Sequence, residues 1–245
     1  MGANAQTSVP VFVTGQVLTA QQQTEINTGI PVFADSTARD AAFGGTGEKT
    51  LAEGQFAFLE DTNVTQYYDG ASWEAVGVSG LTLITSATAP GSSASMSIDN
   101  VFSATYKNYL IVSNLYTSAA SQQLLYAKMR LSGTDASTNY DYLISYMTTG
   151  AGPTRDYATG GTLGMFFGYC SNNAGGSTAT FTLANPAIAS ATSLTSISNS
   201  LGTGTYQILM GGSTHTTATA YDGITFSVNG GNLTGDVRIY GIANS

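Results

Sequence analysis

The sequence is poor in the residues on which metal sites, disulfide frameworks and charged interfaces depend. Its 245 residues include one cysteine, one histidine and five prolines, and charged side chains make up only 9% of the chain, against about a quarter in typical soluble domains. A single cysteine allows no internal disulfide, and one cysteine with one histidine cannot build a zinc cluster. We therefore expect no disulfide framework, no bound metal and no cofactor.

Basic residues and long apolar runs are also scarce. Seven lysine and arginine residues against fifteen acids give a net charge of −8, which opposes the phosphate contacts that dominate nucleic-acid binding. No apolar run approaches the roughly 20 residues that span a bilayer, and the first ten residues lack the basic and apolar regions of a signal peptide. We predict no nucleic-acid partner, no membrane insertion and synthesis in the cytoplasm.

Small hydroxylated residues, glycine and tyrosine are abundant instead. The chain has 61 serine and threonine residues, 29 glycines and 14 tyrosines, and 42% of it is apolar. So large an apolar share argues against disorder, and the shortage of strong helix formers argues against a helical bundle. The composition is typical of a β-rich globular protein with a weakly charged surface.

The acidic charge is concentrated in the first third of the chain. Residues 1–80 hold nine acids and two bases, a net charge of −7, whereas residues 81–245 hold six acids and five bases, a net charge of −1. This change predicts two modules with a boundary near residues 77–80. The expected parts are an arm (1–30), a small α+β module (31–77), a linker with a first strand (78–96) and a C-terminal sandwich (97–245).

Residues 1–30 have the pattern of an attachment arm. A short extended apolar run is followed by Thr19 and Gln22, whose spacing is that of a capping box, in which each side chain bonds the backbone N–H of the other residue. The helix that they begin ends near Gly29 and is too short to be stable alone, so we expect it to dock on this chain or on a partner. The residues predicted to make the attachment are Val9, Val11, Phe12, Val13, Val17, Leu18 and Ile26.

Residues 31–77 are predicted to form a compact module. The run 31–33 indicates a short strand, Ser36 is the expected N-cap of a helix over 37–43, and Trp73 is expected to pack the core. Asp69 and Gly70 lie between two β-prone runs, which is a strong hairpin signal because both central turn positions favour positive φ.

From residue 81 onward, apolar residues recur with the period of two that is typical of strands. In residues 124–131, Leu125, Ala127, Met129 and Leu131 share one face, and Ser132-Gly133 ends the run. Short strands separated by Gly, Ser and Asn clusters predict an antiparallel, jelly-roll-like β-sandwich of eight to ten strands. Further strands are expected within 109–116, 140–147, 163–170, 178–183, 206–210, 224–228 and 237–242.

Two sets of residues occur in a distinctive order. One runs through the small module, and the other opens and closes the sandwich. The module contains Val32-Phe33, Thr37-Ala38-Arg39-Asp40-Ala41, Glu53-Gly54-Gln55-Phe56-Ala57, Asp61-Thr62, Tyr67-Tyr68-Asp69-Gly70 and Trp73. The sandwich opens with residues 97–102, Tyr106 and 108–112, and closes with residues 224–228, 231–235 and 237–241.

In this order of residues the chain resembles the virion appendage proteins of tailed bacteriophages, which include tail fibres and head fibres. In them such a module stands near the front and a similar β-sandwich ends the chain. The resemblance implies an arm attached to other virion structural proteins, a sandwich displayed outward, and assembly as a homotrimer. We therefore expect a non-enzymatic structural component of the virion.

Three roles remain open within this resemblance. A tail fibre would recognise a glycan or protein on the host cell surface, and this role is favoured here. A capsid decoration or head-fibre protein would stabilise or ornament the shell. A polysaccharide-degrading tail enzyme would need two carboxyls about 5–10 Å apart, but turn capping explains the six acids of the sandwich without catalysis. These acids are Asp99, Asp135, Asp141, Asp156, Asp222 and Asp236.

Three Gly-, Ser- and Asn-rich stretches of the sandwich, 148–161, 171–177 and 211–223, are predicted to be long loops. Such residues with tyrosine suit recognition surfaces, although the loops could equally connect strands or pack against neighbouring copies. A Ser/His/Asp triad that includes His215 and Asp222 is not favoured, because the sequence contains no G-x-S-x-G elbow. His215 is instead expected at the surface. The candidate receptor-binding residues are Arg155, Asp156, Tyr157, His215, Tyr221 and Asp222.

Overall fold

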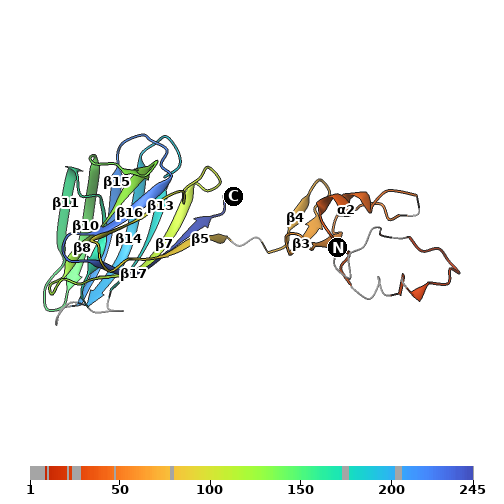
Figure 1. The fold of residues 1–245 in the computed structure, drawn as a ribbon, viewed down its shortest axis with the longest axis horizontal. Helices are drawn as coiled ribbons and strands as arrows, with labels where there is room; N and C mark the ends of the chain where they lie inside the picture. Colours follow the sequence, from red (N-terminus) through yellow and green to blue (C-terminus); the bar gives the residue numbers. More distant parts are fainter. Residues whose placement is uncertain are drawn as a thin grey trace. The chain divides into compact units, whose positions relative to one another are not determined.

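The chain folds into two compact units, Met1–Val78 and Ser79–Ser245. The structure is a computed structural model that describes residues 9, 11–20, 22–23, 29–46, 48–77, 80–172, 177–201 and 206–244 (Figure 1). The division falls in the stretch where the charge composition changes. The fold is mainly β with antiparallel sheets, as the sequence predicted, and each unit has its own hydrophobic core.

The first unit contains a four-stranded sheet in the order β1-β2-β3-β4. β1 (Val32–Phe33) pairs in parallel with β2 (Phe56–Leu59), while β3 (Val64–Tyr68) pairs antiparallel with β2 and with β4 (Trp73–Ala75). The helix α2 (Ser36–Ala41) follows β1 and lies against β1 and β2. The short strand, the helix and the hairpin are therefore all present where the sequence predicted them.

The core of the first unit is built around Phe33 and Leu59, which are almost fully buried. Trp73 covers this core between the rings of Phe43 and Tyr68, with centroid distances of 5.9 and 5.6 Å. Packing of tilted aromatic rings at this spacing is favourable beyond the area that it buries. The expectation that Trp73 packs the module is confirmed.

The N-cap of α2 differs from the prediction. Asp35 has extended backbone angles, and its carboxylate accepts a hydrogen bond from the N–H of Ala38 at 2.8 Å. Ser36 is therefore the first residue of the helix rather than its cap. Aspartate and serine are about equally good N-caps. Because Asp35 and Ser36 are adjacent, the sequence alone could not show which of them is the cap.

The hairpin between β3 and β4 has a four-residue turn, and the side chain of Asp69 makes hydrogen bonds that stabilise it. Its carboxylate accepts bonds from the N–H groups of Ala71 and Ser72 at 2.8 and 2.7 Å, and these bonds lower the pKa of Asp69 below its ordinary range. Gly70 has a φ of 100°, but Asp69 does not have a positive φ. The predicted hairpin is present, although the prediction that both residues need positive φ is wrong.

The second unit is a β-sandwich, and its larger sheet has eight strands in the order β11-β10-β15-β14-β13-β7-β17-β5. All neighbouring strands in it are antiparallel, and β11 and β5 form its two edges (Figure 1). The strands are β5 (Leu81–Thr88), β7 (Asn108–Thr117), β10 (Tyr140–Thr148), β11 (Thr154–Gly161), β13 (Ser177–Ala184), β14 (Thr192–Leu201), β15 (Tyr206–His215) and β17 (Leu233–Ile242).

The smaller sheet has the order β12-β8-β16-β6, with β9 paired to β8. Because β5 pairs along β17 and β6 begins at Ser95, the sandwich begins at Leu81. The stretch 78–96, expected to be a linker with one strand, thus supplies a strand to each sheet. The strands are β6 (Ser95–Ile98), β8 (Gln123–Leu131), β9 (Thr134–Asp135), β12 (Met165–Cys170) and β16 (Gly223–Val228).

Strand β12 is buried on both of its faces. Phe167 points into the main core between the sheets, where its ring lies 4.9 Å from that of Phe181. Phe166 points the other way and packs with Ile144 of β10 and Leu209 of β15 in a second cluster. The pairing of β12 with β8 has a bulge directly after Phe166. The large sheet therefore curls over the β12 edge of the small sheet.

The buried face of β14 carries small polar residues where it meets β12. Ser196, Ser198 and Ser200 are all buried, and a Cβ at Gly168 of β12 would lie 2.8 Å from the hydroxyl oxygen of Ser198. Larger side chains would not fit at this separation. Serine and glycine at these positions thus permit the close approach of the two sheets.

We predict that Gly235→Ala destabilises the sandwich. Gly235 in β17 has a φ of 104°, and a Cβ there would overlap the Asn114 carbonyl oxygen on β7. Left-handed strain and overpacking each cost about 1–3 kcal/mol, so the midpoint of thermal unfolding should fall by roughly 4–24 °C. Gly152→Ala is the matched control, because a Cβ there meets nothing within 4 Å. Equal shifts in the two variants would contradict the prediction.

Candidate recognition face

The large sheet has one buried face and one face that turns away from the core, called the outer face below. Alternation along β10 places Ile144 in the second cluster, with Phe166, and leaves Leu143 63% exposed. On β14 the same alternation buries Leu194 and Ser196 and leaves Ile197 exposed. The outer face is thus an open surface of the sheet. Exposed apolar side chains stand on it, whereas the solvated face of an antiparallel sheet is usually polar.

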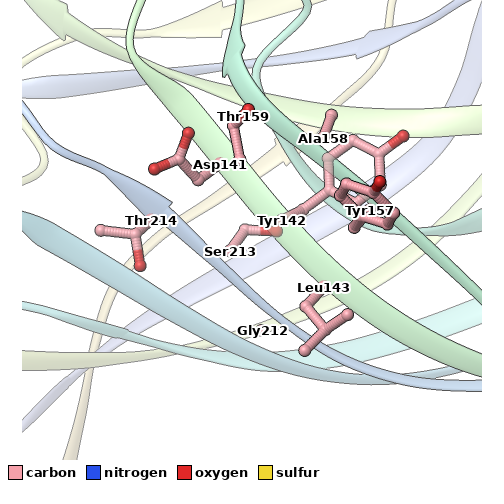
Figure 2. Close-up of a pocket in the computed structure, with 9 residues that line it drawn as sticks. All are labelled: Asp141, Tyr142, Leu143, Tyr157, Ala158, Thr159, Gly212, Ser213 and Thr214. Atoms are coloured by element: carbon pink, nitrogen blue, oxygen red, sulfur yellow. The ribbon is translucent and has the colours of Figure 1, made fainter.

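A hollow of about 380 Å³ lies on the outer face where β10, β11 and β15 run side by side (Figure 2). It forms over Gly212, which has no side chain and which pairs directly with Leu143. Its lining residues are Asp141, Tyr142, Leu143, Tyr157, Ala158, Thr159, Gly212, Ser213 and Thr214.

The side chains of this hollow offer an apolar platform with polar groups around it. Tyr157 on β11 is 73% exposed and lies opposite Leu143 in register. Asp141 binds the N–H of Gly160 through one carboxylate oxygen at 2.6 Å. Among the described residues, the hydroxyl of Thr214 has no hydrogen-bond partner. The hollow can therefore hold an apolar group and bond polar groups beside it.

A second hollow of about 460 Å³ lies on the outer face over β13, β14 and β15. Thr178 and Thr180 form one side of it, and Tyr206 and Ile208 form the other. The residues at its base, Ile197 and Asn199, project from β14. Both hollows are thus parts of one sheet face and not of loops.

The predicted loop at 148–161 is mostly a strand. Its second half is the edge strand β11, joined to β10 by a turn at residues 149–153. Arg155 and Tyr157 project from β11 on the outer face, opposite Ser145 and Leu143. Asp156 lies on the other face of the strand, where it accepts a bond from the N–H of Tyr157 at 2.8 Å. The candidates on this strand are exposed, but they are held by a sheet.

His215 is buried, and the expectation that it lies at the surface is wrong. It ends β15 with 1% of its surface exposed, and its ring stacks on Tyr140 at 4.4 Å. The carbonyl of Asn139 can only accept, so Nδ1 of His215 carries the proton at 3.2 Å from it. Nε2 then accepts from the hydroxyl of Tyr221 at 2.6 Å. Burial lowers the pKa of His215.

Tyr221 and Asp222 have structural contacts as well. Tyr221 is 5% exposed and belongs to the main core. The carboxylate of Asp222 accepts a bond from the N–H of Ser132 at 3.0 Å, and its carbonyl accepts bonds from the N–H groups of Val101 and Phe102. The structure therefore brings His215 and Tyr221 together as a core pair, and neither is available to a receptor on the folded surface.

The acids and the cysteine of the sandwich also have structural partners. Asp99 and Asp135 both bind the guanidinium of Arg130, at 2.8 and 2.5 Å, so an arginine lies between the two carboxylates. Within the described part of the chain, no group of three or more His, Cys, Asp or Glu side chains could hold a metal ion. Burial raises the pKa of the Cys170 thiol to about 12, which makes it a poor nucleophile.

The predicted arm is divided between packed and exposed residues. Val9 packs on the core of the first unit, and its N–H donates to the carbonyl of Ala42 at 3.1 Å. Thr19 and Gln22 make the predicted capping box, with bonds of 3.0 and 3.2 Å. Leu18 is half-buried and Ile26 lies outside the described residues. The exposed candidates are Val11, Phe12, Val13 and Val17, of which Val17 is 89% exposed.

No helix in the described ranges is long and apolar enough to cross a membrane.

We predict that His215→Gln makes stability less dependent on pH. Burial lowers the pKa of His215 below 6.5, so His215 is protonated at a higher pH in the unfolded chain than in the folded chain. The free energy of unfolding therefore decreases as the pH falls below about 6.5. Glutamine is polar but does not titrate. Midpoints of thermal unfolding at about pH 7.5 and pH 5 should therefore differ more for the natural chain than for the variant. Equal differences would show that His215 makes no such contribution.

No protein-family model, curated protein or solved structure that was searched matches this chain. A function for the outer face therefore has to be inferred from its own side chains, their exposure and their charges. The exposed hollow beside Tyr157 and the exposed apolar residues of the arm are the strongest of these observations.

Proposed function

We propose that this protein is a non-enzymatic structural component of a tailed-phage virion, a fibre-like appendage that displays its sandwich for recognition of the host surface. The observation that carries this proposal is the division into two units with separate cores, each of which leaves an apolar surface exposed. One surface suits attachment and the other suits recognition. The order of residues that resembles phage appendage proteins supports the same assignment.

The exposed residues of the arm support attachment to other virion structural proteins. Val11, Val13 and Val17 expose more than half of their surface, and Phe12 exposes 38%. Burying such side chains contributes about 25 cal/mol for each Å² of apolar area removed from water. A partner that covers this run would therefore gain several kcal/mol from the arm. Val9 anchors the base of the run to its own module.

The hollow beside Tyr157 supports recognition by the sandwich. Tyrosine gives a large contact area at a low cost in side-chain entropy, and Tyr157 stands on an edge strand that is paired along β10. The hollow carries a carboxylate, Asp141, and no basic side chain. Arg155 projects from the same face of β11 beside the hollow, so charges of both signs border it, and it suits a polar group of a host-surface glycan or protein. We propose that such appendages assemble as homotrimers.

Labelling of intact particles tests the location. Antibodies against the full chain, coupled to gold, should mark the tail or baseplate of purified phage particles. Label over the capsid or its vertices would favour a head-fibre or decoration role that stabilises or ornaments the shell. Absence of label from every particle would overturn the proposal of a virion protein.

We predict that replacing Val11, Phe12, Val13 and Val17 by serine reduces incorporation into particles at least tenfold. The four side chains are exposed in the described arm, so the thermal stability of the chain should stay unchanged while the partner loses its apolar contact. Incorporation is measured by immunoblot of purified particles after complementation. Val76→Ser is the control, because Val76 is 47% exposed on the same unit but outside the arm. Normal incorporation of the fourfold variant would contradict attachment through this run.

We predict that Tyr157→Ala reduces binding of the full chain to host cells at least tenfold. The side chain projects into solvent, so its loss removes recognition area without opening a cavity in the core. Binding of fluorescently labelled protein to intact cells is the measurement, with unfolding midpoints as a check on folding. Leu163→Ala is matched in exposure, at 57%, and lies outside the hollow. If both variants bind as the natural chain does, Tyr157 has no part in recognition.

A further inference from the structure

The hollow beside Tyr157 is built from two rows of side chains that cross the outer face. Directly opposite residues of neighbouring strands stand side by side, so the register of β11, β10 and β15 fixes these rows. The polar row contains Thr159, Asp141 and Thr214, and the apolar row contains Tyr157, Leu143 and Gly212. Because alternate residues of a strand share a face, the rows are about 7 Å apart along the strands. Figure 2 shows the polar row toward one end of the hollow and Leu143 toward the other.

The carboxylate of Asp141 is held in the middle of the polar row. Thr159 and Gly160 both lie opposite Asp141, at a bulge in the pairing of β11 with β10. Gly160 has a φ of 62°, and its N–H donates to one carboxylate oxygen of Asp141 at 2.6 Å. No donor among the described residues bonds the second oxygen. The carboxylate is therefore oriented by the backbone and still has an acceptor to offer.

Hydroxyl groups flank this carboxylate on both sides. Thr159 stands beside it on β11, Thr214 lies directly opposite it on β15, and Ser193 of β14 follows in the same line. Within the described ranges, the hydroxyls of Thr159 and Thr214 make no hydrogen bond. Each hydroxyl can both donate and accept. The polar row can therefore bond several neighbouring hydroxyl groups of one ligand.

The apolar row offers a flat surface beside these polar groups. Tyr157 and Leu143 lie opposite each other with 73% and 63% of their surfaces exposed, and Gly212 leaves room next to them. The face of a tyrosine ring carries the negative part of its quadrupole, so it attracts the weakly positive C–H groups on one face of a sugar ring. A ligand that has a C–H face and a hydroxylated edge satisfies both rows.

Other classes of ligand fit these rows less well. The strands β10 and β15 are paired on both sides, so their backbone groups cannot add an extended peptide as a further strand. An acidic group would meet the carboxylate of Asp141, and like charges repel. Arg155 stands opposite Ser145, about 14 Å along the strands from Asp141, which is too far to bind the same small group.

We infer that the hollow binds one neutral sugar ring of a host-surface glycan, with the C–H face on Tyr157 and neighbouring hydroxyls on the polar row. This deepens the proposed recognition by the sandwich and rests on it. Hydroxyl groups bond an ionised carboxylate more strongly than a neutral acceptor. Asp141 therefore selects the positions of the sugar hydroxyls, and Tyr157 provides most of the contact area.

The first test is an NMR titration of the full chain, labelled with ¹⁵N, with the methyl glycosides of glucose, galactose, mannose, rhamnose and N-acetylglucosamine. At least one should shift the amide resonances of the hollow, and Asp141→Asn should weaken its binding at least tenfold. Asp236→Asn is the control, because it removes the same charge from an outer-face side chain that is 40% exposed and lies outside the hollow. Absence of binding by all five glycosides, or equal binding by the two variants, would overturn the inference.

Charged probes test whether the ligand is neutral. The methyl glycoside of N-acetylneuraminic acid and lysine amide should each bind at least tenfold more weakly than the best neutral glycoside. Tighter binding of the acidic sugar would overturn the choice of a neutral ring. Tighter binding of lysine amide would show that Asp141 pairs with a cation instead.

Treatment of host cells gives a second measurement, made with the full chain on intact cells. Mild periodate, which cleaves the vicinal diols of sugars, should lower binding at least tenfold, whereas protease treatment should leave it unchanged. The reverse pattern would indicate a protein receptor and overturn the inference. If gold marks the tail but no glycoside binds, only the sugar site is wrong. If a glycoside binds but no particle is labelled, the virion function is wrong and the sugar site stands.

Discussion

The burial of strand β12 on both of its faces is the constraint on which the sandwich depends. Phe167 fills the main core while its neighbour Phe166 fills the cluster on the other side, because successive side chains of a strand point to opposite faces. Ile144 and Leu209 complete that cluster from β10 and β15. The curl of the large sheet follows from this contact, and so does the position of the outer face.

The small polar residues of the sequence make the curl possible. Ser196, Ser198 and Gly168 lie where β14 and β12 approach most closely, and apolar side chains of ordinary size would hold the strands apart. A composition rich in serine and glycine, which could be taken only as a sign of a soluble surface, therefore also shapes the core. Charged residues are excluded from these positions because burying an unpaired charge is costly.

Much of the fold could be predicted from sequence because it depends on local patterns. The period of two over residues 124–131 marks β8, and the spacing of Thr19 and Gln22 marks a capping box that the structure contains. The strand β11 was predicted as a loop, because an edge strand exposed on both sides has no apolar alternation and its glycines and charges are those of a turn.

The candidate site was harder to predict, since it depends on contacts between distant residues. His215 sits among threonines that suggest a loop, and its burial comes from Tyr140 and Tyr221 on other segments. Tyr157, predicted as a receptor-binding residue of a loop, is an exposed strand residue, and the hollow beside it requires Gly212 of a strand that is not adjacent in sequence. The exposure of Met210 and Ile197 follows from the alternation along β14 and β15 together with their pairing, and no local motif signals it.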